Sequence, residues 1–217
     1  MKRNRWAVDA ALLAGAAAVT AAVLGPALGA DLAVRDWADA HRPRPADLLA
    51  RGLNYLGQGT PLTLVALGLA ALLAWRRHTV RPLLPVAAAL ALTYLTVGPL
   101  KLVFDRAAPH TFAIPHPERF ASGGVSFPSG HAVNAIVWYG VLALLLDDRL
   151  PDRWRTAVRV VPPAVVCVVT TYTGFHWLTD TVTGLLLGLA LDRLLRRVPW
   201  SKLPLGRRLR AAGWDGP

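Results

Sequence analysis

The sequence has one cysteine and few charged residues, since Asp, Glu, Lys and Arg make up only 17% of its 217 residues. A single thiol, Cys167, excludes an intrachain disulfide bond and a cysteine metal cluster. No internal repeat, low-complexity tract or separate soluble domain is recognisable in the sequence. We therefore expect one domain over residues 1–217.

Hydrophobic residues make up 54% of the chain, and the mean hydropathy is +0.39. This composition is typical of a membrane protein, in which each spanning helix needs roughly 20 apolar residues. Five clear runs contain no Asp, Glu, Lys or Arg: Ala10 to Ala30, Gly52 to Trp75, Pro82 to Leu100, Phe127 to Leu146 and Val160 to Thr179. A sixth run, Thr181 to Leu191, is long enough only if Asp180 and Asp192 lie at or inside the helix ends. We therefore predict an all-α polytopic protein with six transmembrane helices.

The distribution of basic residues predicts the orientation in the cell membrane. With a cytoplasmic N-terminus, 17 of the 24 Lys and Arg residues fall on the cytoplasmic side, as expected for short inner loops. Both termini are then cytoplasmic. Residues 1–51 would form the first helix and an outer loop, residues 52–197 a core, and residues 198–217 a basic cytoplasmic tail. Within the outer loop, helical spacing of apolar residues predicts a short interfacial helix around Pro45 to Leu56.

The basic residues have one simple explanation and two alternatives. The net charge of +11 is explained by anionic lipid headgroups facing the tail and short loops. Nucleic-acid binding is disfavoured, because the basic residues are scattered over loops and no recognition fold accompanies them. The first apolar run is also compatible with a secretory signal, since "MKRNR" precedes it and "ALGA" offers small residues for cleavage.

In this topology, the polar residues near apolar runs gather at the outer face. Ionisable residues at membrane depth are costly and indicate a functional site. They come from the end of the third run, the loop after it, the start of the fourth run and the junction of the last two runs. These residues are Lys101, Arg106, His110, His116, Arg119, Ser129, Gly130, His131, His176 and Asp180.

The spacing of these residues favours phosphoryl chemistry. His176 and Asp180 are four residues apart, so on a helix the carboxylate can fix one ring nitrogen and leave the other as a nucleophile or a general base. His131 is a candidate general acid. Ser129 is a good N-cap, and the free backbone N–H groups at a helix start, with Gly130, make an anion site. Lys101 adds a cation suited to phosphate.

Two alternatives use the same residues. Two histidines and one aspartate are also metal ligands, although no further acidic residue is obviously placed on this face to complete a metal site. A proton or ion relay is the other, although nearly all of these charges fall at helix ends.

The order of motifs resembles the type 2 phosphatidic acid phosphatase superfamily, which includes polyprenyl-diphosphate phosphatases and vanadium haloperoxidases. Its signatures are Lys, six residues and Arg-Pro; then Pro-Ser-Gly-His; then Ser-Arg, five residues, His, three residues and Asp. "PSGH" at 128–131 and "HWLTD" at 176–180 match, and Lys101 has the right distance to Pro109. The resemblance covers about residues 52–197.

The resemblance implies a membrane phosphatase that hydrolyses lipid phosphates or polyprenyl diphosphates without a metal or cofactor. It implies that His176 attacks phosphorus to form a phosphohistidine, that Asp180 orients it, and that His131 protonates the leaving alkoxide. Lys101, Ser129 and Gly130 would hold the phosphoryl oxygens.

Both arginines of the signatures are absent. Ala108 stands at one position, and Val169-Thr170 replaces Ser-Arg at the other. Arg106 is the candidate substitute for phosphate binding. A phosphotransferase using the same histidine and a catalytically silent lipid-phosphate binder are the alternative functions.

Overall fold

The computed structural model describes residues 3–111, 113–204 and 214. This part of the chain is helical, with α-helices joined by short turns and by one long loop between α5 and α6. The helices are α1 (Arg3–Ala22), α2 (Ala27–Ala40), α3 (Arg44–Asn54), α4 (Gly59–Arg77), α5 (Leu83–Phe104), α6 (Gly130–Leu145), α7 (Asp152–Tyr172) and α8 (Leu178–Leu195), with short 3-10 helices η1 (Tyr55–Gly57) and η2 (Trp200–Lys202).

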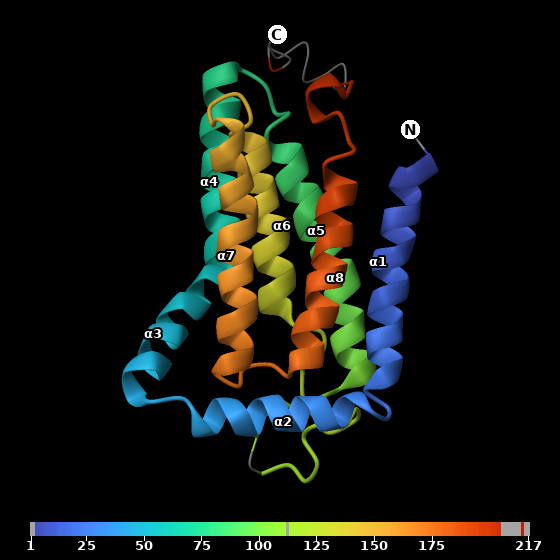
Figure 1. The fold of residues 1–217 in the computed structure, drawn as a ribbon. Coiled ribbons are helices and arrows are strands. Elements are labelled where there is room, and N and C mark those ends of the chain that lie inside the picture. Colours follow the sequence, from blue (N-terminus) through green and yellow to red (C-terminus); the bar gives the residue numbers. More distant parts are fainter. Residues whose placement is uncertain (1–2, 112, 205–213, 215–217) are drawn as a thin grey trace.

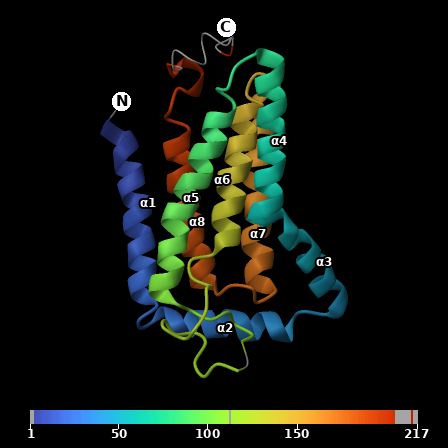
Figure 2. The same cartoon turned by 180° about the vertical axis from the view of Figure 1, so that it is seen from behind.

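The bundle consists of α1 and α4 to α8, which run along a common axis (Figures 1 and 2). Helix α2 lies across one end of this bundle, and α3 slopes back from it towards α4. The start of α1 and the end of α8 lie at the opposite end. The long loop between α5 and α6 lies at the α2 end, so that end carries most of the irregular structure.

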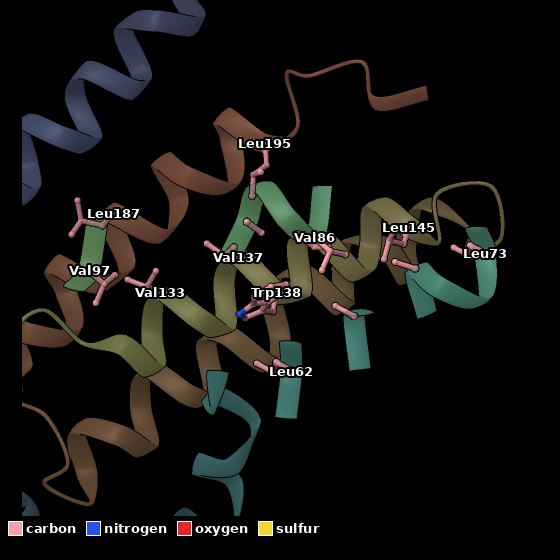
Figure 3. Packing of buried hydrophobic residues seen from close by; sticks show 14 of the residues in the cluster. Leu62, Leu73, Val86, Val97, Val133, Val137, Trp138, Leu145, Leu187 and Leu195 are labelled. Atoms are coloured by element: carbon pink, nitrogen blue, oxygen red, sulfur yellow. The ribbon is translucent and has the colours of Figure 1, made fainter. Parts of the chain in front are cut away.

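Helix α6 is the centre of the bundle, packed against α4, α5, α7 and α8. Its side chains Val133, Val137 and Trp138 are at most 1% exposed and form the middle of the apolar core (Figure 3). Helix α8 approaches α6 through Gly184 and Gly188, where an added Cβ would come within 2.6 Å and 3.0 Å of α6 residues or its cap. Small residues of this kind let helices in membranes pack closely.

The first apolar run does not form one helix through Ala30, which corrects the sequence prediction. Helix α1 ends at Ala22, and α2 begins at Ala27 after a bend of 83°. Pro26 lies in the break, where its ring and missing N–H would disrupt a continuous helix. The bend places the charged half of the segment across the end of the bundle rather than along it.

The other predicted elements are found with shifted ends. The helix predicted around Pro45 to Leu56 is found as α3, Arg44–Asn54, so α4 starts at Gly59 rather than at Gly52, and its interfacial position stays a prediction. Helix α7 starts at Asp152, eight residues before the predicted run, because that run is limited to residues after the last charged side chain, Arg159. The sixth segment is α8, and it includes both Asp180 and Asp192, as its length required.

In the described part of the chain, two helices, α4 and α5, are long and apolar enough to cross a membrane by themselves, and counting the bent pair α1 and α2 as one span gives three. Helix α6 is apolar but has only 16 residues, and α7 and α8 carry charges at their ends. The count of six spans therefore stays a prediction.

Candidate active site

Four segments that are distant in the sequence meet at the α2 end of the bundle: η1 with the start of α4, α5 with the loop after it, the start of α6, and the turn between α7 and α8. They line a cavity of about 640 Å³ whose lining includes Lys101, Ser126, Gly130, His131, Asn134 and His176. The sequence prediction placed Lys101, Gly130, His131 and His176 at one site, and the structure brings these four together around this cavity.

The start of α6 gives the cavity one wall. Ser129 caps the helix, with its Oγ 3.3 Å from the backbone N–H of Ala132, and its own N–H donates to the carbonyl of Asp180 at 2.9 Å. Ser129 is fully buried and does not line the cavity. Its side chain therefore caps the helix, and its predicted role in phosphate binding stays a prediction.

The start of α8 places Asp180 beneath His176. The Asp180 carboxylate is fully buried and accepts from the backbone N–H of Trp177 at 3.1 Å and from the Ser126 hydroxyl at 2.6 Å. His176 Nδ1 lies 3.6 Å from Asp180 Oδ2 and 3.1 Å from Ser126 Oγ. Ser126 therefore bridges the two residues that the sequence pattern paired directly.

His131 contacts His176 at the wall of the cavity. Its Nδ1 lies 3.3 Å from His176 Nε2, and its Nε2 lies 3.1 Å from the amide nitrogen of Asn54 at the end of α3. Gly57 of η1 permits this approach, because an added Cβ there would lie 3.2 Å from the Cβ of His131 and 2.5 Å from Val166.

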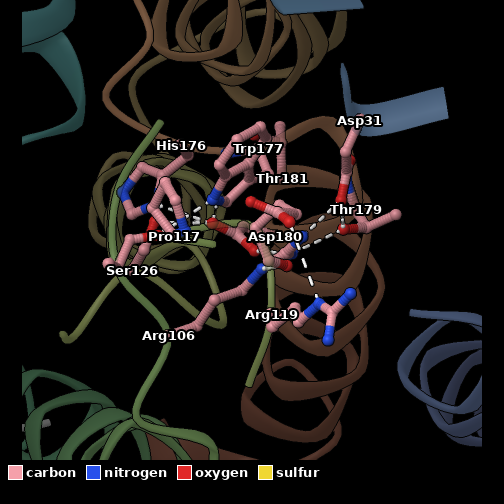
Figure 4. A network of polar contacts seen from close by, with 12 residues as sticks. Asp31, Arg106, Pro117, Arg119, Ser126, His176, Trp177, Thr179, Asp180 and Thr181 are labelled. Carbon is pink, nitrogen blue, oxygen red and sulfur yellow. Dashed lines mark hydrogen bonds and ion pairs between the residues drawn. The ribbon is translucent and has the colours of Figure 1, made fainter. Parts of the chain in front are cut away.

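Arg106 lies outside the cavity lining, and its exposed fraction is 0%. The guanidinium donates to Asp180 and Asp31 at 2.6 Å each, to Thr179 at 2.8 Å and to the carbonyl of Glu118 at 2.8 Å (Figure 4). The structure therefore does not bring Arg106 to the proposed phosphate position, because two buried carboxylates use its charge. It acts instead as the cation that offsets burial of these acids.

The long loop between α5 and α6 holds Arg106 and Ser126 in place. The Ser126 N–H donates to the carbonyl of Arg106 at 2.8 Å, and Gly124 donates to the side chain of Asp105 at 2.9 Å. Gly124 is required for this fold, since an added Cβ would lie 2.5 Å from the Cα of Ala107. The loop thus links the end of α5 to the site.

Lys101 lines the cavity from α5, and its Nζ donates to the carbonyl of Val125. Ala108 also lines the cavity, and it stands where the first signature quoted above has an arginine. Thr170, at the other missing arginine, is fully buried in α7. His110, His116 and Arg119 do not line the cavity; His110 lies 3.1 Å from Asp39.

Sequence reasoning missed four residues of the site: Asn54, Ser126, Asn134 and Asp31. Two of them carry a signal that could have been read. Asn134 is the one polar amide in the fourth apolar run and lies one helical turn after His131, and Ser126 stands two residues before "PSGH". Asp31 directly follows the first run, but its contact with Thr179, 2.6 Å between side-chain oxygens, depends on the bend before α2.

No three His, Cys, Asp or Glu side chains converge into a group that could hold a metal ion among residues 3–111, 113–204 and 214. The cavity is lined by two imidazoles, one ammonium group, neutral polar groups and apolar side chains that include Val125 and Phe175.

Comparisons with known proteins agree with this arrangement. The family model described as PAP2 superfamily matches residues 82–204. Over 102 residues the chain is 32% identical to phosphatidylglycerophosphatase B of Bacillus subtilis (strain 168), an alignment that covers 45% of this chain and about half, 48%, of that relative.

The crystal structure of the first transmembrane PAP2 type phosphatidylglycerolphosphate phosphatase from Bacillus subtilis is similar over 87% of this chain and 94% of that one. The TM-score is 0.74 and the sequence identity is 27%. The family match covers more than half of the chain, including Lys101, His131, His176 and Asp180. The chain therefore belongs to the PAP2 superfamily.

Proposed function

We propose that this protein is a membrane phosphatase that removes the terminal phosphate from a lipid phosphate through a phosphohistidine intermediate. The observation that carries the proposal is the facing pair of imidazoles, with His131 Nδ1 3.3 Å from His176 Nε2 beside the ammonium group of Lys101. A nucleophile and an acid must act on opposite sides of one phosphoryl group, so in this proposal the two rings separate as the phosphoryl group enters between them.

The reaction has two steps. His176 Nε2 attacks phosphorus, the bond between phosphorus and the lipid oxygen breaks, and protonated His131 gives its Nδ1 proton to that oxygen. Neutral His131 then takes a proton from water, which attacks the phosphohistidine and releases inorganic phosphate. Lys101 and the backbone N–H groups at the start of α6 offset the phosphoryl charge.

A lipid substrate is favoured by a second cavity that joins the first. It has a volume of about 440 Å³, shares Lys101, Gly130 and Asn134 with the site, and continues between α4 and α5 along apolar side chains that include Leu64, Leu90 and Val97. A lipid whose phosphate lies at His176 would extend its apolar chain into this second cavity. The names of both relatives make phosphatidylglycerophosphate the first substrate to test.

The missing arginines support one other candidate, a lipid-phosphate binder without turnover. Among the described residues that line the site cavity, Lys101 is the only Lys or Arg. A single lost donor to a transition state costs about 2.7–4 kcal/mol, so loss of two is a large penalty.

Phosphate release from purified protein in detergent micelles separates these candidates. We expect release from phosphatidylglycerophosphate, phosphatidic acid or a polyprenyl diphosphate, little from glycerol phosphate, and no loss with a chelator. His176→Ala should abolish turnover and acid-labile phosphate incorporation, whereas an exposed-site control, Leu48→Ala, should retain both. Binding of these lipids without any release would favour the silent binder, and transfer to an added alcohol would indicate a phosphotransferase.

A further inference from the structure

A row of four side-chain contacts crosses the site from α3 to α8. Asn54 Nδ2 lies 3.1 Å from His131 Nε2, His131 Nδ1 lies 3.3 Å from His176 Nε2, His176 Nδ1 lies 3.1 Å from Ser126 Oγ, and Ser126 Oγ lies 2.6 Å from Asp180 Oδ2. Each histidine uses both ring nitrogens and Ser126 uses one hydroxyl for two contacts, so the proton position at one contact determines the next.

The Asp180 end fixes the direction. Asp180 is paired with Arg106 at 2.6 Å, and an ionised carboxylate only accepts hydrogen bonds. The Ser126 hydroxyl therefore donates to Asp180, and its oxygen accepts from Nδ1–H of His176. Neutral His176 then has its lone pair on Nε2, the atom that attacks phosphorus.

The same reasoning continues to His131. Because His176 Nε2 is an acceptor in the reactive form, His131 must hold a proton on Nδ1. The reverse arrangement, with both rings neutral and His176 protonated on Nε2, would turn the Ser126 hydroxyl towards His176. It would then leave two oxygen lone pairs facing each other at the 2.6 Å contact with Asp180.

The partner of His131 Nε2 is an amide, which suits both charge states of the ring. When His131 is neutral, the Asn54 N–H donates to the Nε2 lone pair; when His131 is protonated, the amide oxygen can turn to accept from Nε2–H. Turning sacrifices no other contact, because Asn54 Oδ1 is buried without a hydrogen-bond partner in the described part of the chain. Asn54 itself is only 3% exposed.

We propose that Asn54 is a positioning residue that holds His131 so that Nδ1 is the ring atom that exchanges the catalytic proton. This inference rests on the proposed phosphatase function. Burying the Asn54 amide costs folding free energy, because its Nδ2 contacts His131 but its Oδ1 has no partner in the described part of the chain. Stability of the fold alone would not favour an asparagine at this position. The proposed role also gives α3 a part in the site, since Asn54 is the last residue of that helix.

The activity test compares leaving groups. Asn54→Leu should lower turnover of the phosphatidylglycerophosphate by tenfold or more, within the 10²–10⁴-fold that general acid catalysis contributes. The burst of nitrophenolate from p-nitrophenyl phosphate reports the first step with a leaving group that needs no proton, and it should fall much less. Asn54→Asp should retain more turnover than Asn54→Leu, because a carboxylate still accepts from Nε2–H.

Tyr55→Leu is the matched control, since the neighbouring Tyr55 is 64% exposed and should tolerate the change. Equal losses on both substrates in Asn54→Leu would indicate a structural role only and would overturn the proposal. So would unchanged turnover of both substrates in that variant.

A second measurement does not depend on activity. Nitrogen-15 NMR of histidine-labelled protein, assigned with His131→Gln and recorded where both rings are neutral, should show the His131 proton on Nδ1. Asn54→Leu should show a mixture of tautomers. A wild-type proton on Nε2 would contradict the proposal even if lipids are hydrolysed, whereas a proton on Nδ1 in a protein without turnover would leave the tautomer assignment standing and refute the phosphatase function.

Discussion

Single residues divide into those whose partner lies nearby in the sequence and those whose partner does not. His176 and Asp180 could be predicted as a pair from their spacing of four residues, although His176 lies in the turn before α8, which starts at Leu178. "PSGH" could be placed at a helix start from its capping chemistry. Ser126 and Asn54 could not be assigned, because their partners lie 50 and 77 residues away. Only the closed fold shows that Ser126 stands between the predicted pair.

Arg106 shows why residue type and sequence position alone do not identify a phosphate ligand. An arginine near a phosphate signature predicts a phosphate ligand, but Arg106 lies in the loop after α5 and pairs with Asp31 of α2 and Asp180 of α8. Removing one partner of such a buried pair costs about 3–5 kcal/mol, so Arg106 variants would report on folding as well as catalysis. Ala108 is a cleaner position at which to test the missing charge.

Ala108→Arg should restore a cation to the cavity, because Ala108 lines it and the PAP2 signature quoted above has arginine there. We expect tighter inhibition by orthovanadate and a lower KM for the lipid phosphate, by about tenfold, which corresponds to roughly 1.4 kcal/mol. Inhibition constants measured in micelles check this. Ala113→Arg is the control, since it adds the same charge to an exposed position of the same loop outside the cavity lining. Equal effects of both variants would mean that overall charge, rather than position 108, is responsible.

At the scale of elements, uncharged apolar runs located most of the helices, and the misplaced ends have physical reasons. Pro26 divides the first run, and the polar start of α7 is helical because its arginines find partners, such as Asp192 for Arg159 at 2.8 Å. A count of apolar residues does not contain these contacts. The glycines of α8 likewise read as ordinary helix residues in the sequence, although their role is to let α6 approach.

Gly184→Ala should destabilise the protein, because the new Cβ would lie 2.6 Å from the carbonyl oxygen of Ser129 and 3.1 Å from Ala132. Overpacking of this kind costs about 1–3 kcal/mol, and the shift would also move the start of α6 that carries His131. We expect a lower Tm and reduced turnover. Gly68→Ala in α4 is the control: nothing lies within 4 Å of its Cβ, so alanine should be neutral or stabilising by about 0.5–1 kcal/mol. Matching Tm values for the two variants would show that α6 and α8 are less tightly packed than described.

For the whole molecule, the arrangement of the bundle agrees with the charge-based topology in one respect. The start of α1 and the end of α8 lie together, and the site lies at the other end beneath α2 (Figure 1). The positive-inside distribution predicts that the end with the start of α1 and the end of α8 is cytoplasmic. The site is then predicted to face the outside, with α2 and α3 in the membrane interface.

Cysteine labelling in intact bacterial cells tests this orientation, because the chain has one native thiol, Cys167, which can be replaced by serine. In that background, Ala113→Cys puts a thiol in the exposed loop at the site end, and Arg149→Cys puts one in the exposed turn between α6 and α7 at the other end. A membrane-impermeant maleimide should label position 113 in intact cells and position 149 only after permeabilisation. The Cys167→Ser protein without an added cysteine gives the background. Labelling of position 149 alone in intact cells would show that the site faces the cytoplasm. Labelling of both positions would show that both lie outside, so that the segment between them does not cross the bilayer once.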